Sequence, residues 1–132
     1  MAVPNDIQQT ILLVDDEADV RRIAGMILSE PDFCVIEAGS AEKAMAIVRG
    51  STRIDLLMTD LARPGVGGIE LAHLAKRVRP GLKVLYTSAY VRASDSSKAL
   101  HHGPFVEKPW RLEQLEGAIE KLLGPRPLRQ PT

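Results

Sequence analysis

Short apolar runs alternate along the chain with longer segments of helical spacing, and this alternation constrains the fold more than any other feature. The runs cover residues 11–14, 33–36, 56–58, 84–86 and 105–106. A short continuous apolar run is typical of a strand that is buried on both faces of a sheet. The pattern therefore predicts five buried strands, all of them far too short to cross a bilayer.

The segments between the runs predict helices, each with a single apolar stripe. Ser40 is a candidate N-cap for the second helix, and Gly124 marks the end of the last one. A further helix near residues 92–102 is predicted to be short, because that stretch is mostly polar. The stripes comprise Val20, Ile23, Ala24, Ile27 and Leu28 in the first helix, Ala41, Ala44, Met45 and Val48 in the second, Leu71, Leu74, Ala75 and Val78 in the third, and Leu112, Leu115, Ile119 and Leu122 in the last.

Five strands that alternate with five helices predict an α/β fold with a parallel sheet. Parallel neighbours need crossover connections, which are right-handed, so helices cover both faces of the sheet. We therefore predict one doubly wound domain over residues 10–124, with tails at residues 1–9 and 125–132.

Composition and charge narrow the functional classes. The chain has 132 residues, 45% of them apolar, which is enough to bury a core without disulfides. Its single cysteine, Cys34, cannot form an internal disulfide, and its polar start lacks a signal pattern, so we expect a cytoplasmic protein. The formal net charge of +0 argues against bulk nucleic-acid binding. This total is the sum of two opposite halves: residues 1–60 carry a net charge of −6, and residues 61–132 carry +6.

Polar side chains stand at the carboxyl ends of the predicted strands, where doubly wound folds bind ligands. Asp15 and Asp16 follow the first strand, and Asp60 ends the third. Ser88 ends the fourth strand, and Lys108 follows the fifth. Two carboxylates roughly 4 Å apart repel by about 4 kcal/mol at an effective dielectric of about 20. A cation must compensate, and Lys108 with a hard, oxygen-preferring ion such as Mg²⁺ would do so, since no His or Cys clusters with these acids.

Several of these residues also have structural interpretations. Asp15 and Asp16 could be the N-cap and first-turn acids of the first helix, and a lone aspartate at a strand end is often a turn residue. Carboxylates, a hydroxyl and a lysine at four strand ends nevertheless favour a functional site.

The other polar and aromatic candidates are interpreted as structural. We expect His73 to be a surface residue, because domains with a phosphotransfer histidine are helical bundles and this chain is rich in strands. His101 and His102 are also expected at the surface, because adjacent histidines on a helix point in different directions and no third ligand is near in sequence. Trp110 is expected to pack against the last helix.

The strand-end motifs resemble those of the receiver domains of two-component response regulators, over about 115 residues. The fold that this resemblance implies is a flavodoxin-like (βα)5 domain with strand order 2-1-3-4-5. The implied function is a phosphorylation-activated signalling switch, which is not an enzyme beyond catalysing its own phosphorylation and dephosphorylation. The resemblance lies in Leu13-Val14-Asp15-Asp16, in Asp60 followed by Pro64 and Gly68, in Ser88-Ala89, and in Lys108-Pro109.

The resemblance also implies a phosphoacceptor and its metal ligands. Asp60 would accept a phosphoryl group from a sensor histidine kinase, a histidine phosphotransfer protein or a small phosphodonor. Asp15, Asp16 and Asp60 would hold Mg²⁺ or Mn²⁺, with Asp15 acting through a water. The backbone carbonyl of Ala62 would complete the protein ligands.

Lys108 would pair with the phosphoryl oxygens, and its peptide bond to Pro109 would be cis. Ser88 and Phe105 would form the switch: the hydroxyl would move to bond the phosphoryl group while the aromatic ring turns inward. Plain core packing is an equally good interpretation of Phe105.

Two positions bear on the lifetime of the phosphorylated form. Ala62, two residues after Asp60, has no side chain to orient an attacking water, and Tyr90, two residues after Ser88, could shield the phosphate. We therefore expect slow self-dephosphorylation. The 20 residues from Ser88 to Lys108 are few for the family, and the missing length falls at the usual output face.

Two other functions stay open. A Mg²⁺-dependent aspartyl-phosphate phosphatase would need a second Asp two residues after the nucleophile, where this chain has Ala62. A receiver-like interaction module that is never phosphorylated would be expected to have lost one of the site residues. The expected partners are a kinase or phosphotransfer protein and a downstream protein target, with no DNA or membrane contact. Homodimerisation, and whether the domain stands alone or belongs to a larger protein such as a hybrid kinase, are left open.

Overall fold

The computed structural model describes residues 9–29, 33–61, 67–88, 105–107 and 111–124. Strands and helices alternate over these residues, and the predicted helix near residues 92–102 lies outside them. The elements are β1 (Thr10–Val14), α1 (Ala18–Ser29), β2 (Cys34–Ala38), α2 (Ala41–Arg49), β3 (Leu56–Asp60), α3 (Gly68–Val78), β4 (Lys83–Ser88), β5 (Phe105–Glu107) and α5 (Leu112–Leu123).

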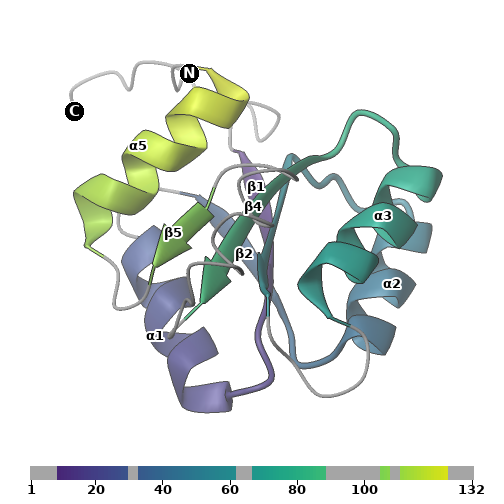
Figure 1. Cartoon of the computed structure of the whole chain (residues 1–132), viewed down its shortest axis with the longest axis horizontal. Helices are drawn as coiled ribbons and strands as arrows, with labels where there is room; N and C mark the ends of the chain where they lie inside the picture. Colours follow the sequence, from purple (N-terminus) through teal and green to yellow (C-terminus); the bar gives the residue numbers. More distant parts are fainter. Residues whose placement is uncertain (1–8, 30–32, 62–66, 89–104, 108–110, 125–132) are drawn as a thin grey trace, which may run out of the picture.

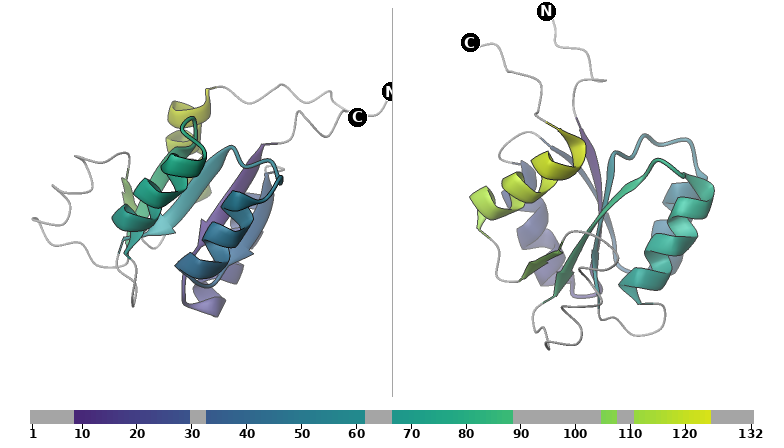
Figure 2. Two further views of the ribbon diagram at one scale, coloured as in Figure 1. Left: turned by 90° about the vertical axis from the view of Figure 1, so that its right-hand side faces the viewer. Right: turned by 45° about the horizontal axis from the view of Figure 1, so that its top comes forward.

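The strands form one five-stranded sheet in the order β2-β1-β3-β4-β5. Each pair of neighbours is parallel. Helices α1 and α5 cover one face of the sheet, and α2 and α3 cover the other (Figures 1 and 2). The predicted doubly wound fold with strand order 2-1-3-4-5 is confirmed.

The core consists of two layers because successive residues of a strand point to opposite faces. Ile11 and Leu13 of β1 pack under α1 and α5, whereas Leu12 and Val14 pack under α2 and α3. Every residue of β1 and β3 is buried, as the continuous apolar runs predict. In β2 only Ala38 is buried, so the prediction of burial on both faces is wrong for this strand. The reason is its place at the edge of the sheet, where it has a single neighbouring strand.

The helical stripes are correct except at two positions. Ile23 of α1 is 56% exposed and Val78 of α3 is 44% exposed, so neither belongs to the core. In α1 the buried residues are Ala24, Gly25 and Leu28. The small residues Ala24 and Gly25 therefore face the sheet and turn Ile23 outward.

Local signals fix the ends of two helices. The Ser40 side chain accepts a hydrogen bond from the backbone N–H of Lys43 at 3.1 Å, which confirms the predicted N-cap of α2. Gly124 ends α5 with φ +82°, a left-handed conformation that favours glycine, and its N–H donates to the carbonyl of Glu120 at 2.8 Å. None of the helices in the described ranges is long and apolar enough to cross a membrane.

Candidate functional site

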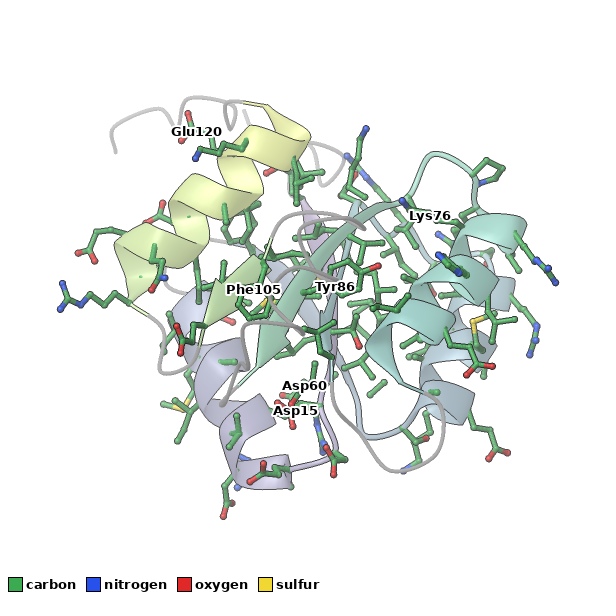
Figure 3. The ribbon with its side chains drawn as sticks, in the orientation of Figure 1. Asp15, Asp60, Lys76, Tyr86, Phe105 and Glu120 are labelled. Carbon is green, nitrogen blue, oxygen red and sulfur yellow. The ribbon has the colours of Figure 1, made fainter. Side chains whose placement is uncertain are left out.

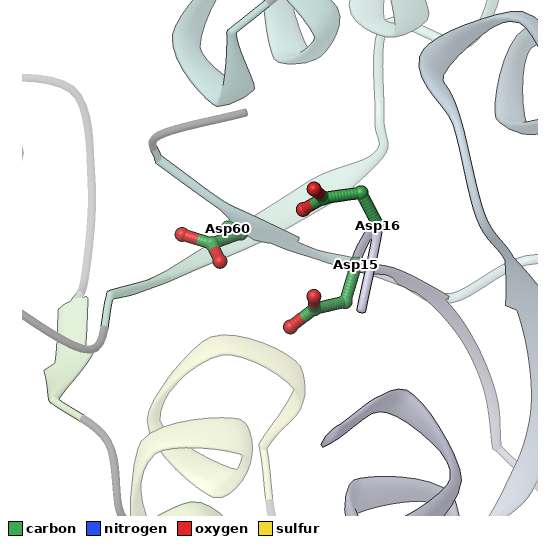
Figure 4. Close-up of side chains that lie close together, drawn as sticks. All are labelled: Asp15, Asp16 and Asp60. Carbon is green, nitrogen blue, oxygen red and sulfur yellow. The ribbon is translucent and has the colours of Figure 1, made fainter. Parts of the chain in front are cut away.

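Three carboxylates gather where the neighbouring strands β1 and β3 end. Asp15 and Asp16 follow β1, and Asp60 is the last residue of β3. One carboxylate oxygen from each residue lies within 4.8 Å of the other two (Figures 3 and 4). Asp15 and Asp60 are buried, at 1% and 7% exposure, whereas Asp16 is exposed. The cluster is therefore held in the edge of the sheet and meets solvent at Asp16.

Two hydrogen bonds with backbone groups hold Asp15 in the loop between β1 and α1. The N–H of Asp15 donates to the carbonyl of Ala38 at 3.2 Å, which extends the pairing of β1 with β2. Its Oδ1 accepts a hydrogen bond from the N–H of Glu17 at 2.9 Å. Because α1 begins only at Ala18, neither Asp15 nor Asp16 is its N-cap, and the alternative interpretation of these two residues as helix-start acids is wrong.

The backbone that follows Asp60 is held from two sides. The N–H of Leu61 donates to the carbonyl of Thr87 at 2.8 Å, and the carbonyl of Leu61 accepts from the N–H of Gly68 at 3.0 Å. Gly68, the first residue of α3, lies so close that a Cβ there would clash with the backbone oxygen of Asp60. The glycine of the sequence motif therefore allows α3 to start directly against the residue that carries the carboxylate.

The chemistry of this cluster fits a hard divalent cation. Three carboxylates this close repel one another, and a cation between them relieves that repulsion. All three donors are oxygen atoms, and the cluster found among the described residues contains no histidine or cysteine. Oxygen donors of this kind suit Mg²⁺ better than zinc.

The structure also places the backbones of the two predicted switch residues. Ser88 ends β4 opposite Glu107 of β5, at the same edge of the sheet as Asp60, which pairs with Thr87. Phe105 begins β5 opposite Tyr86 and is half-buried against the core under α2 and α3 (Figure 3). Both interpretations of Phe105, switch and core packing, are compatible with this position.

The remaining predicted positions are described in part. His73 is exposed on α3, as predicted. Seven other predicted positions lie outside the described residues: Ala62, Tyr90, His101, His102, Lys108, Pro109 and Trp110.

Sequence reasoning missed one residue next to the site. Nη1 of Arg21, on α1, donates to the backbone carbonyl of Asp15 at 2.6 Å, and its Nε donates to Oε1 of Glu37 at 3.2 Å. No sequence signal separates Arg21 from Arg22 beside it, because both are basic residues on the same helix.

Known proteins resemble the chain in sequence and in structure. Residues 11–120 match the family model of the response regulator receiver domain. The chain is 30% identical over 115 residues to the response regulator receiver protein CpdR of Brucella abortus, and this match covers 86% of the chain and 95% of CpdR. It is also 33% identical over 119 residues to a cyclic di-GMP phosphodiesterase of Thermotoga maritima, and this match covers 89% of the chain but only 32% of the phosphodiesterase.

A solved structure supports the same relationship. The response regulator protein TrrA of Thermotoga maritima, in complex with Mg²⁺-BeF, has a TM-score of 0.74 and 28% identity. The match covers 88% of this chain and 100% of that one. The chain belongs to the response regulator receiver domain family, the phosphorylatable signalling modules of two-component systems.

Proposed function

We propose that the chain is a phosphorylation-controlled switch in which Asp60 is the phosphoacceptor. The supporting observation is the position of Asp60 at the end of β3, with its carboxylate in a cluster with those of Asp15 and Asp16. A carboxylate oxygen of Asp60 would attack the phosphorus of a phosphohistidine or of acetyl phosphate. A new O–P bond forms, the bond to the donor breaks, and the imidazole or acetate leaves with its electron pair. The product is an acyl phosphate on Asp60.

The same cluster would hold the metal ion. Asp15, Asp16 and Asp60, with the backbone carbonyl of Ala62, are the proposed ligands of Mg²⁺ or Mn²⁺. When bound, the ion would neutralise charge on the phosphoryl oxygens during transfer. Lys108 is the proposed second positive charge at those oxygens. The relative TrrA has been solved in complex with Mg²⁺-BeF, which supports the proposal that this chain also binds Mg²⁺.

The signal would leave the site through β4 and β5. Asp60 pairs with Thr87, which precedes Ser88, and Tyr86 pairs with Phe105 on the next strand. A hydroxyl movement at Ser88 and a ring movement at Phe105 would therefore change adjacent positions of the sheet. We also propose that Asp60 loses its phosphoryl group slowly. Ala62 has no side chain to orient an attacking water, and Tyr90 would shield the phosphate.

The partners follow from the family. We propose a histidine kinase or phosphotransfer protein as the donor and a protein as the downstream target. The receiver domain would occupy residues 10–124, close to the matched residues 11–120. The lone Cys34, with no second cysteine for an internal disulfide, supports a cytoplasmic location.

The test is phosphorylation by acetyl phosphate with Mg²⁺, followed by intact mass spectrometry. We expect the wild type to gain the mass of one phosphoryl group and Asp60→Asn to gain none. Asp19→Asn is the matched control, because Asp19 is an exposed acid in the first turn of α1 and the charge change is the same. This control should be phosphorylated like the wild type.

The other outcomes contradict the proposal in distinct ways. An adduct on Asp60→Asn would show that another residue is the acceptor. Rapid turnover of phosphate monoesters would indicate the phosphatase instead. A wild type that forms no adduct would leave an interaction module that is not phosphorylated.

A further inference from the structure

The guanidinium of Arg21 bridges the loop that carries Asp15 and the end of β2. It donates from Nη1 to the carbonyl of Asp15 and from Nε to the carboxylate of Glu37, and its side chain is only 19% exposed. Gly39 makes room for it, since a Cβ at that position would lie 3.1 Å from Nη1. The side chain is therefore held by hydrogen bonds to Asp15 and Glu37 and lies close to Gly39.

The carbonyl that Arg21 binds belongs to the peptide joining Asp15 to Asp16. A peptide unit is planar, so the direction of its carbonyl also sets the direction in which Asp16 leaves the loop. The amide and the carboxylate of Asp15 are already bonded, to Ala38 and to Glu17 respectively. The bond from Arg21 adds a side-chain restraint to the peptide that sets the directions of the Asp15 and Asp16 carboxylates. Figure 4 shows these two carboxylates beside that of Asp60.

We propose that Arg21 is a positioning residue for the metal site, which holds the Asp15–Asp16 peptide so that both carboxylates face Asp60. The inference rests on the proposed function, because it requires the three carboxylates to bind Mg²⁺. Residues that orient metal ligands without touching the metal typically change its affinity by about 10- to 100-fold when removed.

The charge of Arg21 and its hydrogen bond to the loop predict opposite changes in Mg²⁺ affinity when Arg21 is removed. Removing a positive charge near a cation site would by itself tighten Mg²⁺ binding. Losing the orientation of Asp15 and Asp16 would weaken it. The sign of the change in affinity therefore separates positioning from simple electrostatics. A residue that only stabilises the fold would lower the free energy of unfolding when removed and leave the Mg²⁺ affinity of the folded protein unchanged.

The experiment is calorimetric titration of the unphosphorylated full chain with Mg²⁺. We expect the dissociation constant of Arg21→Ala to rise by about 10-fold. Arg22→Ala is the matched control, since it removes the same charge from the adjacent, exposed position of α1, and its affinity should be unchanged or slightly tighter. Arg21→Lys keeps the charge, but its single nitrogen cannot reproduce the fork of Arg21, so we expect an intermediate loss.

Each outcome decides the inference. If the wild type binds Mg²⁺ and Arg21→Ala binds it equally or more tightly, the inference is overturned and the metal site stands. If the wild type does not bind Mg²⁺, the inference and the proposed metal site fall together. Thermal unfolding without Mg²⁺ verifies that Arg21→Ala is folded. Should it not fold, Arg21→Lys decides, and wild-type affinity in that variant overturns the inference.

Discussion

Gly68 shows, at the scale of single residues, how an absent side chain shapes the site. The first residue of α3 lies against the backbone of Asp60, and a Cβ there would clash with the carbonyl oxygen and lie 3.1 Å from Cα of Leu61. Both neighbours are backbone atoms, which cannot rotate away as a flexible side chain can. Either α3 or the end of β3 would have to move, and Asp60 would move with the strand.

We expect Gly68→Ala to destabilise the fold by about 1–3 kcal/mol, the usual range for an overpacked site. Urea denaturation measures this free energy of unfolding. Gly117→Ala is the control, because Gly117 lies inside α5 and, apart from its chain neighbours and the backbone of its own helix, no atom lies within 4 Å of the added Cβ. That variant should gain about 0.5–1 kcal/mol from the higher helix propensity of alanine. Equal stability of the two variants would contradict the clash at Gly68.

Arg79 acts at the scale of elements, where it ties α3 to the end of α2. It is the C-cap residue of α3, and its Nε and Nη2 donate to the carbonyls of Val48 and Gly50, each at 2.9 Å. The last carbonyls of a helix have no partner within the helix. One side chain from the next helix thus supplies hydrogen bonds at the end of α2.

Replacing Arg79 by alanine is expected to cost about 2 kcal/mol. The partly buried bond to Val48 is a hydrogen bond from a charged group, which contributes about 1.5–3 kcal/mol, and the exposed bond to Gly50 adds little. The loss should appear as a lower urea midpoint and as faster amide hydrogen exchange at the start of the loop after α2. Arg77→Ala removes an exposed charge from the last turn of α3 and should change stability by less than about 0.5 kcal/mol. If both variants unfold at the same urea concentration, the bonds from Arg79 do not stabilise α2.

At the scale of the whole molecule, the strand order keeps the two halves of the chain on separate sides of the sheet. The first 60 residues carry a net −6 and the rest a net +6. The order β2-β1-β3-β4-β5 keeps the three strands of the acidic half together and places the two strands of the basic half beside them. The boundary between the two halves of the chain thus runs through the sheet between β3 and β4, with Asp60 on the last strand of the first half.

The stability of the whole molecule should also fall at alkaline pH because of Tyr86. This residue is 1% exposed on β4, and burial raises its pKa above the ordinary value of 10.0. Above that value the unfolded chain releases the phenolic proton while the folded chain keeps it, so rising pH favours unfolding, by at most about 1.4 kcal/mol per pH unit. Tyr86→Phe should remove this part of the pH dependence. Urea denaturation at about pH 9 and about pH 11 measures both slopes, and identical slopes would contradict the prediction.

The amino-acid sequence was enough to predict the sheet, the acidic cluster and the strands and helices of the described residues. Periodicity predicts strands and helices because it depends on residues close together in the chain. The clustering of Asp15, Asp16 and Asp60 could be predicted because the carboxyl ends of parallel strands lie at one edge of a sheet. The tertiary structure alone decided the exposure of Ile23 and the contacts of Arg21. Both depend on how closely α1 approaches β2, which is a distance between separate elements that no local pattern records.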